Sequence, residues 1–152
     1  MHKKALDQVI NIINELHHTK NFDALLDSVI AKTTEILAAE RSSMYIVNEE
    51  TGELWYRVAQ DMEIKDMKLP VGKGIAGYVA RTGEVVNLHD VYADPRFNPE
   101  IDKLTGFRTR NMLCVPLASH EGKVIGVIQV LNKIDGDFRK EDELLLDSLG
   151  GS

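Results

Sequence analysis

Cysteine is nearly absent from this chain of 152 residues, which contains only Cys114. One cysteine cannot form an internal disulfide or complete a multi-cysteine metal or redox site. Cys114 lies in the apolar run 112–117, and free cysteines are usually buried as small apolar side chains. We therefore interpret Cys114 as a core residue.

Long apolar runs and an excess of basic residues are also lacking. No run approaches the roughly 20 apolar residues of a membrane-spanning helix, and the charged residues 1–4 do not lead into a signal-peptide core. We expect a cytoplasmic chain without a membrane partner. The formal net charge is −6, and because nucleic-acid binding depends on Lys and Arg that neutralise phosphates, we expect no nucleic-acid partner. One small anion could still bind in a local pocket.

The apolar content, by contrast, is sufficient for one folded domain, since 43% of the residues are apolar and the length leaves no room for a separate catalytic domain. Apolar residues recur at helical spacing over 6–16 and 25–37, and two β-rich segments flanking a polar turn predict a hairpin over 44–59. Further strands are expected at 67–69, 85–88, 112–117 and 124–131, and further helices at 75–80 and 139–149. This order predicts an α+β domain with an antiparallel sheet and helices on its faces.

The polar stretch 89–110 reads as a long crossing loop with one helical turn. Loops of this length in compact domains are usually functional.

Gly72, Gly74 and Gly77 spell the pattern G-x-G-x-x-G. A dinucleotide-binding fold needs a long buried strand before this pattern and βαβ units after it, and neither is present. A glycine-rich turn that opens a helix can still hold a phosphate or carboxylate on its free amides. A simple tight turn explains the glycines equally well, so both interpretations stay open.

Histidines and nucleophiles show no catalytic or metal-binding spacing. His17 and His18 are adjacent and would point about 100° apart on a helix, while His89 and His120 lack partners at ligand spacing. No nucleophile stands beside a base in a recognisable local signature. We expect no metal and no enzymatic activity.

Lys133 and Asp142 form a more informative pair, because one ends the last predicted strand and the other begins the last helix. An ion pair between them would tie the helix to the sheet. The alternative is a surface pair that contributes about 0 to 1 kcal/mol.

Lys133 and Asp142 belong to a set of five residues that resembles a family signature. Asn132, Lys133, Phe138, Asp142 and Glu143 resemble the N-K-x(n)-F-x(3)-D-E pattern of GAF domains in cyclic-nucleotide phosphodiesterases and cyanobacterial adenylyl cyclases. The segments 74–90, 105–117 and 124–133 are similar to the same family, and the resemblance extends from about residue 22 onward. It implies a six-stranded antiparallel sheet with helices on one face and a ligand pocket on the other. It also implies that Lys133 and Asp142 bridge each other and do not touch the ligand.

The resemblance further implies a cyclic-nucleotide pocket. By this resemblance, the amides of Ile75 and Ala76 at a helix start would bind the cyclic phosphate, and Ser43 would lie on the strand below the base. Gln129 would lie at the purine edge. Four loop residues would close over the nucleotide, namely Asn98, Asp102, Thr105 and Thr109. Ala59 and Gln60 depart from the pattern, because a cGMP-binding relative has an aromatic residue and an acid there. The loop lacks the cysteine that attaches bilin in photoreceptor GAF domains, and one cysteine cannot complete the cycle of GAF-type methionine sulfoxide reductases.

Gln129 favours cAMP over cGMP. Adenine presents a donor beside an acceptor, which a carboxamide matches, whereas guanine presents two adjacent donors that suit a carboxylate. By resemblance, a cGMP-binding relative carries Glu at this position and cAMP-binding relatives carry Gln.

These observations predict a regulatory GAF domain without a cofactor, in which a core at 21–149 binds a cyclic nucleotide and relays its occupancy to an output domain outside this chain. Residues 1–20 are expected to form a helix that pairs with a second copy in a parallel homodimer, although its apolar stripe could instead fold back on its own sheet. The alternative function is a structural, dimerising GAF domain that holds no nucleotide or binds another small molecule.

Overall fold

The computed structural model describes residues 21–48, 50–58, 68–70 and 74–149. A six-stranded antiparallel sheet runs through its centre in the order β3-β2-β1-β6-β5-β4. The strands are β1 (Ala39–Asn48), β2 (Glu53–Val58), β3 (Lys68–Pro70), β4 (Val86–Leu88), β5 (Met112–Ala118) and β6 (Val124–Lys133). Pro70 ends the edge strand β3, where its missing N–H donor costs no ladder hydrogen bond.

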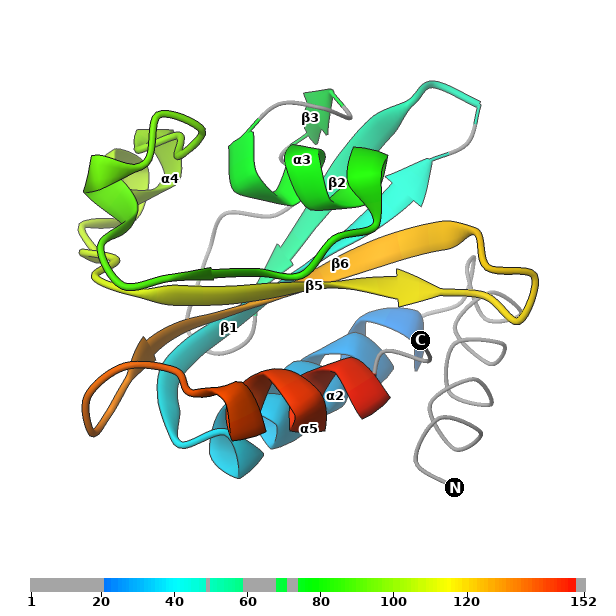
Figure 1. Cartoon of the computed structure of the whole chain (residues 1–152). Coiled ribbons are helices and arrows are strands. Elements are labelled where there is room, and N and C mark those ends of the chain that lie inside the picture. The colour runs from blue at the N-terminus through cyan, green and yellow to red at the C-terminus, as the bar shows by residue number, and fades with distance from the viewer. Residues whose placement is uncertain (1–20, 49, 59–67, 71–73, 150–152) are drawn as a thin grey trace.

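Helices lie on both faces of this sheet (Figure 1). Helices α2 (Asn21–Ile36) and α5 (Lys140–Leu149) lie together on one face, and α3 (Gly74–Thr82) and α4 (Glu100–Thr105) lie on the other side. The α+β architecture expected from the sequence is confirmed. The segment 89–110 contains more helix than predicted, because the 3-10 helix η1 (Val91–Ala93) and α4 both lie within it.

Two apolar clusters lie on opposite faces of the sheet because successive side chains of a strand point in opposite directions. Ile128 and Val130 of β6 belong to the helix-side cluster, beneath α2 and α5, which also contains Leu113, Phe138 and Leu146. Val127 and Leu131 of the same strand belong to the pocket-side cluster, beneath α3, with Tyr45, Ile75, Val79 and Cys114. The central strand β6 therefore contributes to both.

Several sequence expectations fall on parts of the chain for which no structure is described. The predicted dimerisation helix at 1–20 and the departures at Ala59 and Gln60 lie outside the described residues. Within the described residues, no helix is long and apolar enough to cross a membrane.

Candidate functional site

A cavity of about 40 Å³ lies between the sheet, the start of α3 and the α4 segment. Seven of the eight ligand-binding residues expected from the sequence line it, namely Ser43, Ile75, Ala76, Asn98, Asp102, Thr109 and Gln129. The eighth, Thr105, is the last residue of α4, and its side chain is outside the described part of the structure. Gly74, from the glycine-rich turn that the sequence offered as an anion site, also lines the cavity, whereas the remaining lining residues, Tyr45, Phe97, Met112 and Leu131, were not predicted.

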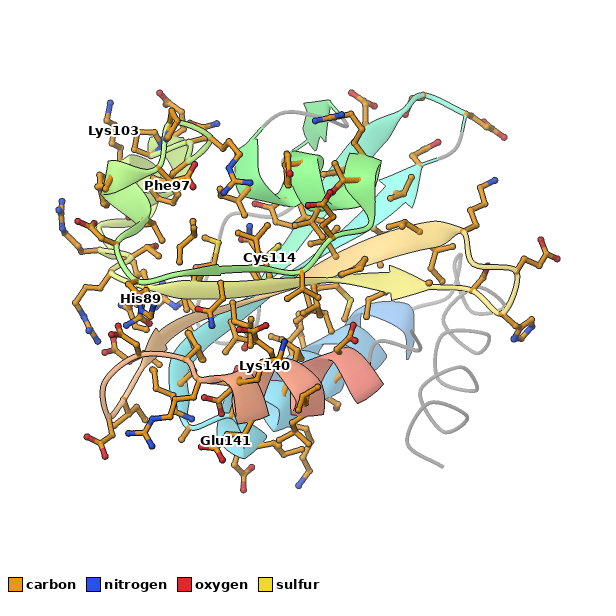
Figure 2. All side chains as sticks on the ribbon, viewed as in Figure 1. His89, Phe97, Lys103, Cys114, Lys140 and Glu141 are labelled. Atoms are coloured by element: carbon orange, nitrogen blue, oxygen red, sulfur yellow. The ribbon has the colours of Figure 1, made fainter. Side chains whose placement is uncertain are left out.

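Two buried residues on neighbouring strands, Ser43 and Gln129, line the sheet side of the cavity, and Cys114 continues their row across the sheet without lining the cavity. Gln129 of β6 stands opposite Ser43 of β1 and opposite Cys114 of β5. Figure 2 labels Cys114 close to the sheet, and its side chain belongs to the cluster beneath α3. Burial raises the pKa of the Cys114 thiol, while a hydrogen bond with Gln129 lowers it by a smaller amount. The thiol is therefore protonated and unreactive at neutral pH, in agreement with the core interpretation of Cys114.

The wall of the cavity is the first turn of α3. Gly74, at the start of the helix, has a φ of +66°, a conformation that glycine adopts without a steric penalty. Ile75 and Ala76 follow and are buried. Because the first amides of a helix have no partner within the helix, this turn directs N–H groups and the positive end of the helix dipole toward the cavity.

The carboxylate of Asp102 closes the opposite side. Its Oδ1 accepts a hydrogen bond from Thr109 Oγ1 at 2.7 Å, and its Oδ2 accepts from the Thr109 N–H at 2.8 Å. Tyr92 Oη also donates to Asp102 Oδ2, at 2.7 Å. Asn98 accepts a hydrogen bond from the N–H of Glu100 at 3.1 Å, which shapes the chain just before α4. The two expected pocket residues Asp102 and Thr109 are thus bonded to each other.

Asn132, the first residue of the family signature, holds the segment that carries Thr109. It has a left-handed φ of +59°, which asparagine tolerates better than most residues. Its Oδ1 accepts from the N–H groups of Arg110 at 2.6 Å and Asn111 at 3.3 Å, and its Nδ2 donates to the Arg108 carbonyl at 2.9 Å. The buried Asn132 side chain therefore fixes the backbone on both sides of Thr109.

Lys133 and Asp142 form the expected ion pair. Lys133 Nζ donates to Asp142 Oδ1 at 3.0 Å and to the Leu37 carbonyl at 2.8 Å, which joins the end of β6 to α5 and to the end of α2. The other Asp142 oxygen accepts the Arg139 N–H at 2.9 Å. This is the reciprocal half of a capping box, and it stabilises the start of α5 although Arg139 offers no capping oxygen.

The two remaining signature residues, Phe138 and Glu143, also hold α5 against the sheet. Phe138 is buried in the helix-side cluster. Glu143 Oε2 accepts a hydrogen bond from Asn87 Nδ2 of β4 at 2.9 Å, and the same nitrogen donates to the Phe138 carbonyl at 3.1 Å. The signature residues thus connect α5, α2 and the segment 89–110, called here the pocket loop, to β6, and connect α5 to β4 as well.

The described residues offer no group of three or more His, Cys, Asp or Glu that could hold a metal ion. Sequence reasoning missed Tyr92, Phe97, Arg108 and Asn111. Asn111 Oδ1 accepts the Lys133 N–H at 2.9 Å, and its Nδ2 donates to the Gly136 carbonyl at 3.0 Å. No local motif marks any of these four residues.

Curated relatives and solved structures resemble this chain. It is 34% identical over 139 residues to a probable 3',5'-cyclic phosphodiesterase, pde-5, of Caenorhabditis elegans, covering 84% of this chain and 19% of the relative. It is 32% identical over 151 residues to the dual 3',5'-cyclic-AMP and -GMP phosphodiesterase 11A of Takifugu rubripes, covering 90% of this chain and 17% of the relative. The chain thus spans less than a fifth of the length of these two relatives.

Solved structures at lower identity show the fold. The GAF domain of a phosphoenolpyruvate-protein phosphotransferase from Coxiella burnetii has a TM-score of 0.73 at 23% identity, covering 98% of this chain and 88% of that one. The free methionine-R-sulfoxide reductase of Neisseria meningitidis has a TM-score of 0.69 at 22% identity, with coverages of 99% and 84%. The model of the GAF domain family matches residues 21–151. The chain therefore belongs to the GAF domain family.

Proposed function

We propose that this chain is a regulatory domain with its core at residues 21–149, which binds a cyclic nucleotide, prefers cAMP to cGMP and relays its occupancy to an output domain elsewhere in a longer protein. The observation that carries the proposal is that seven residues expected to contact the nucleotide line a single cavity. The similarity to two cyclic-nucleotide phosphodiesterases adds support.

Each part of a cyclic nucleotide has a chemically matched partner in this proposal. The amides of Ile75 and Ala76 bind the cyclic phosphate, because a helix start favours an anion. Ser43 lies below the base, and Gln129 pairs with the purine edge. Asn98, Asp102, Thr105 and Thr109 close over the nucleotide.

Binding requires the α4 segment to move. A volume of about 40 Å³ accommodates only a few water molecules, whereas pockets for small-molecule ligands measure about 300–1,000 Å³. Because α3 is packed on the sheet through its buried residues Ile75, Ala76 and Val79, we infer that the shorter helix α4 moves outward to admit the ligand.

The alternative is a structural, dimerising domain that holds no nucleotide or binds another small molecule. The small cavity favours it, as does the mutual hydrogen bonding of Asp102 and Thr109. In either case we propose no enzymatic activity for this domain, because the buried, protonated Cys114 cannot act as a nucleophile.

Isothermal calorimetry with cAMP, cGMP and AMP separates these functions. Saturable binding of cAMP, with no binding of AMP, would support the proposed function, because AMP has the same base but no cyclic phosphate. Binding of neither cyclic nucleotide would favour the alternative. Mass spectrometry of cAMP recovered after incubation should show it unchanged, and hydrolysis would contradict the absence of enzymatic activity.

Replacing Gln129 with glutamate should shift the preference from cAMP toward cGMP. The wild-type preference is expected to be modest, because one matched pair of hydrogen bonds discriminates by about 1 to 3 kcal/mol. The measurement is the ratio of the two dissociation constants. The Gln129→Met variant has a side chain of similar length but no amide, so it should bind both nucleotides more weakly and prefer neither. A ratio that is unchanged in Gln129→Glu, or equal binding of both nucleotides by the wild type, would contradict the assignment.

We further propose that residues 1–20 pair with a second copy in a parallel homodimer. Apolar side chains exposed on the α2 and α5 layer support an interface on this side, since Ile36 is 52% exposed, Leu144 60% and Leu145 37%. Light scattering should give twice the chain mass of 17.0 kDa, and deletion of residues 1–20 should give a monomer. A monomeric mass at high concentration, with and without nucleotide, would instead indicate that residues 1–20 fold back on their own sheet.

A further inference from the structure

Tyr92 joins η1 to α4 through the carboxylate that closes the cavity. Its hydroxyl donates to Asp102 Oδ2, the oxygen that also accepts the Thr109 N–H. The hydrogen bond to Asp102 is the main cause that raises the pKa of Tyr92 above its usual value. The hydroxyl is therefore protonated and able to donate at neutral pH.

Two further contacts fix the Tyr92 ring. The Cζ atom of Arg108 lies 4.0 Å from the ring centroid, a cation–π distance. Phe97 meets the ring edge to face, with centroids 4.9 Å apart and planes at 60°, and Phe97 itself lines the cavity. Figure 2 labels Phe97 next to α4. Tyr92 therefore contacts the lining without belonging to it.

Both partners of Asp102 are anchored to the body of the domain. Val91, next to Tyr92, is fully buried and its N–H donates to the Arg110 carbonyl at 3.1 Å. Thr109 is held through Asn132, which binds the backbone on either side of it. Asp102, in contrast, belongs to the short helix α4. Its side chain thus connects α4 to the anchored segments.

We propose that Tyr92 is a positioning residue that controls the rate at which the pocket opens, by holding Asp102 against the anchored segments. This inference rests on the proposed function, because it assumes a ligand that enters beneath α4. Opening separates Asp102 from both Tyr92 and Thr109. Loss of the Tyr92 hydroxyl lowers the barrier to entry and to release alike.

Tyr92→Phe is the decisive variant, because it removes the hydroxyl and keeps the ring against Arg108 and Phe97. In stopped-flow measurements with a fluorescent cAMP analogue, we expect the association and dissociation rate constants both to rise about tenfold, as loss of a hydrogen bond to a charged group implies. The dissociation constant should change much less. Tyr78→Phe is the control for loss of a tyrosine hydroxyl that does not bind Asp102, because Tyr78 Oη donates to the exposed Glu84 carboxylate at 3.2 Å and its side chain also interacts with Arg96. Rate constants for Tyr92→Phe that equal those of the wild type and of Tyr78→Phe would overturn the proposal.

Hydrogen exchange without nucleotide provides a readout independent of the proposed function. The amides of 102–109 should exchange faster in Tyr92→Phe than in the wild type or Tyr78→Phe, and the increase should be larger there than in the rest of the domain. If the wild type binds no cyclic nucleotide, the proposed function fails, and the exchange rates alone decide whether Tyr92 holds α4. Unchanged exchange in this segment would overturn the role of Tyr92.

Discussion

Replacing Lys133 with alanine should lower the free energy of unfolding by about 3 kcal/mol, because removal of one partner of a buried ion pair leaves the other charge uncompensated. The side chains of Lys133 and Asp142 are only 17% and 11% exposed. The variant also loses the hydrogen bond from Nζ to the Leu37 carbonyl. For a domain of this size the melting temperature should fall by roughly 6–12 °C, as measured by calorimetry or circular dichroism.

Lys140→Ala is the matched control for this change. Lys140 Nζ lies 3.6 Å from Glu143, and its side chain is largely exposed, so its loss should cost less than about 1 kcal/mol. In a double-mutant cycle with Asp142→Ala, the coupling energy isolates the Lys133–Asp142 interaction. Nucleotide binding by Lys133→Ala should weaken only through lost stability. A variant with an unchanged melting temperature that no longer binds nucleotide would show that Lys133 contacts the ligand directly.

Asn132→Ala should destabilise the domain to a similar extent, by about 3 kcal/mol. Alanine at a φ of +59° carries a conformational cost of about 1–2 kcal/mol. The backbone N–H groups of Arg110 and Asn111 also lose their acceptor, at about 1–3 kcal/mol for a buried donor left without a partner. Chemical denaturation gives the free energy. Hydrogen exchange should additionally show faster exchange at 108–111, because these residues lose their connection to β6.

Asn132→Gly separates the two contributions, because glycine tolerates the left-handed backbone but provides no side-chain amide. It should recover about 1 kcal/mol of the loss while exchange at 108–111 remains fast. Equal stability of the alanine and glycine variants would mean that the left-handed backbone at position 132 contributes nothing to the loss of stability in Asn132→Ala. Slow exchange at 108–111 in both would mean that the Asn132 side chain does not hold the pocket loop.

The positions of the main helices and strands could be predicted from the sequence because they follow from burial on one face of each element. The helix expected at 75–80 is observed as Gly74–Thr82, and the strand expected at 85–88 as Val86–Leu88. The paired register of Ser43, Gln129 and Cys114 could not be predicted this way, because alternation along a strand does not specify its partner. The expected pocket residues came from family resemblance and not from periodicity.

The contacts around the pocket loop were not predictable for a different reason. Tyr92, Arg108 and Asp102 are brought together by a segment without regular periodicity, and their interactions depend on the turn around Gly106, which has a φ of +76°. Likewise, nothing local indicates that Asn111 binds the backbone of both Lys133 and Gly136. Such interactions depend on the three-dimensional path of the chain.

The alternation along β6 has a consequence for evolution. Gln129 lies between Ile128 and Val130, whose side chains pack on the opposite face of the sheet, in the helix-side cluster. Substitutions without shared contacts tend to have additive effects, so exchange of the residue at position 129 leaves the packing of α2 and α5 largely intact. A lineage can therefore change the molecule that it recognises while it keeps the same scaffold on the other face, and a single strand allows the two properties to diverge independently.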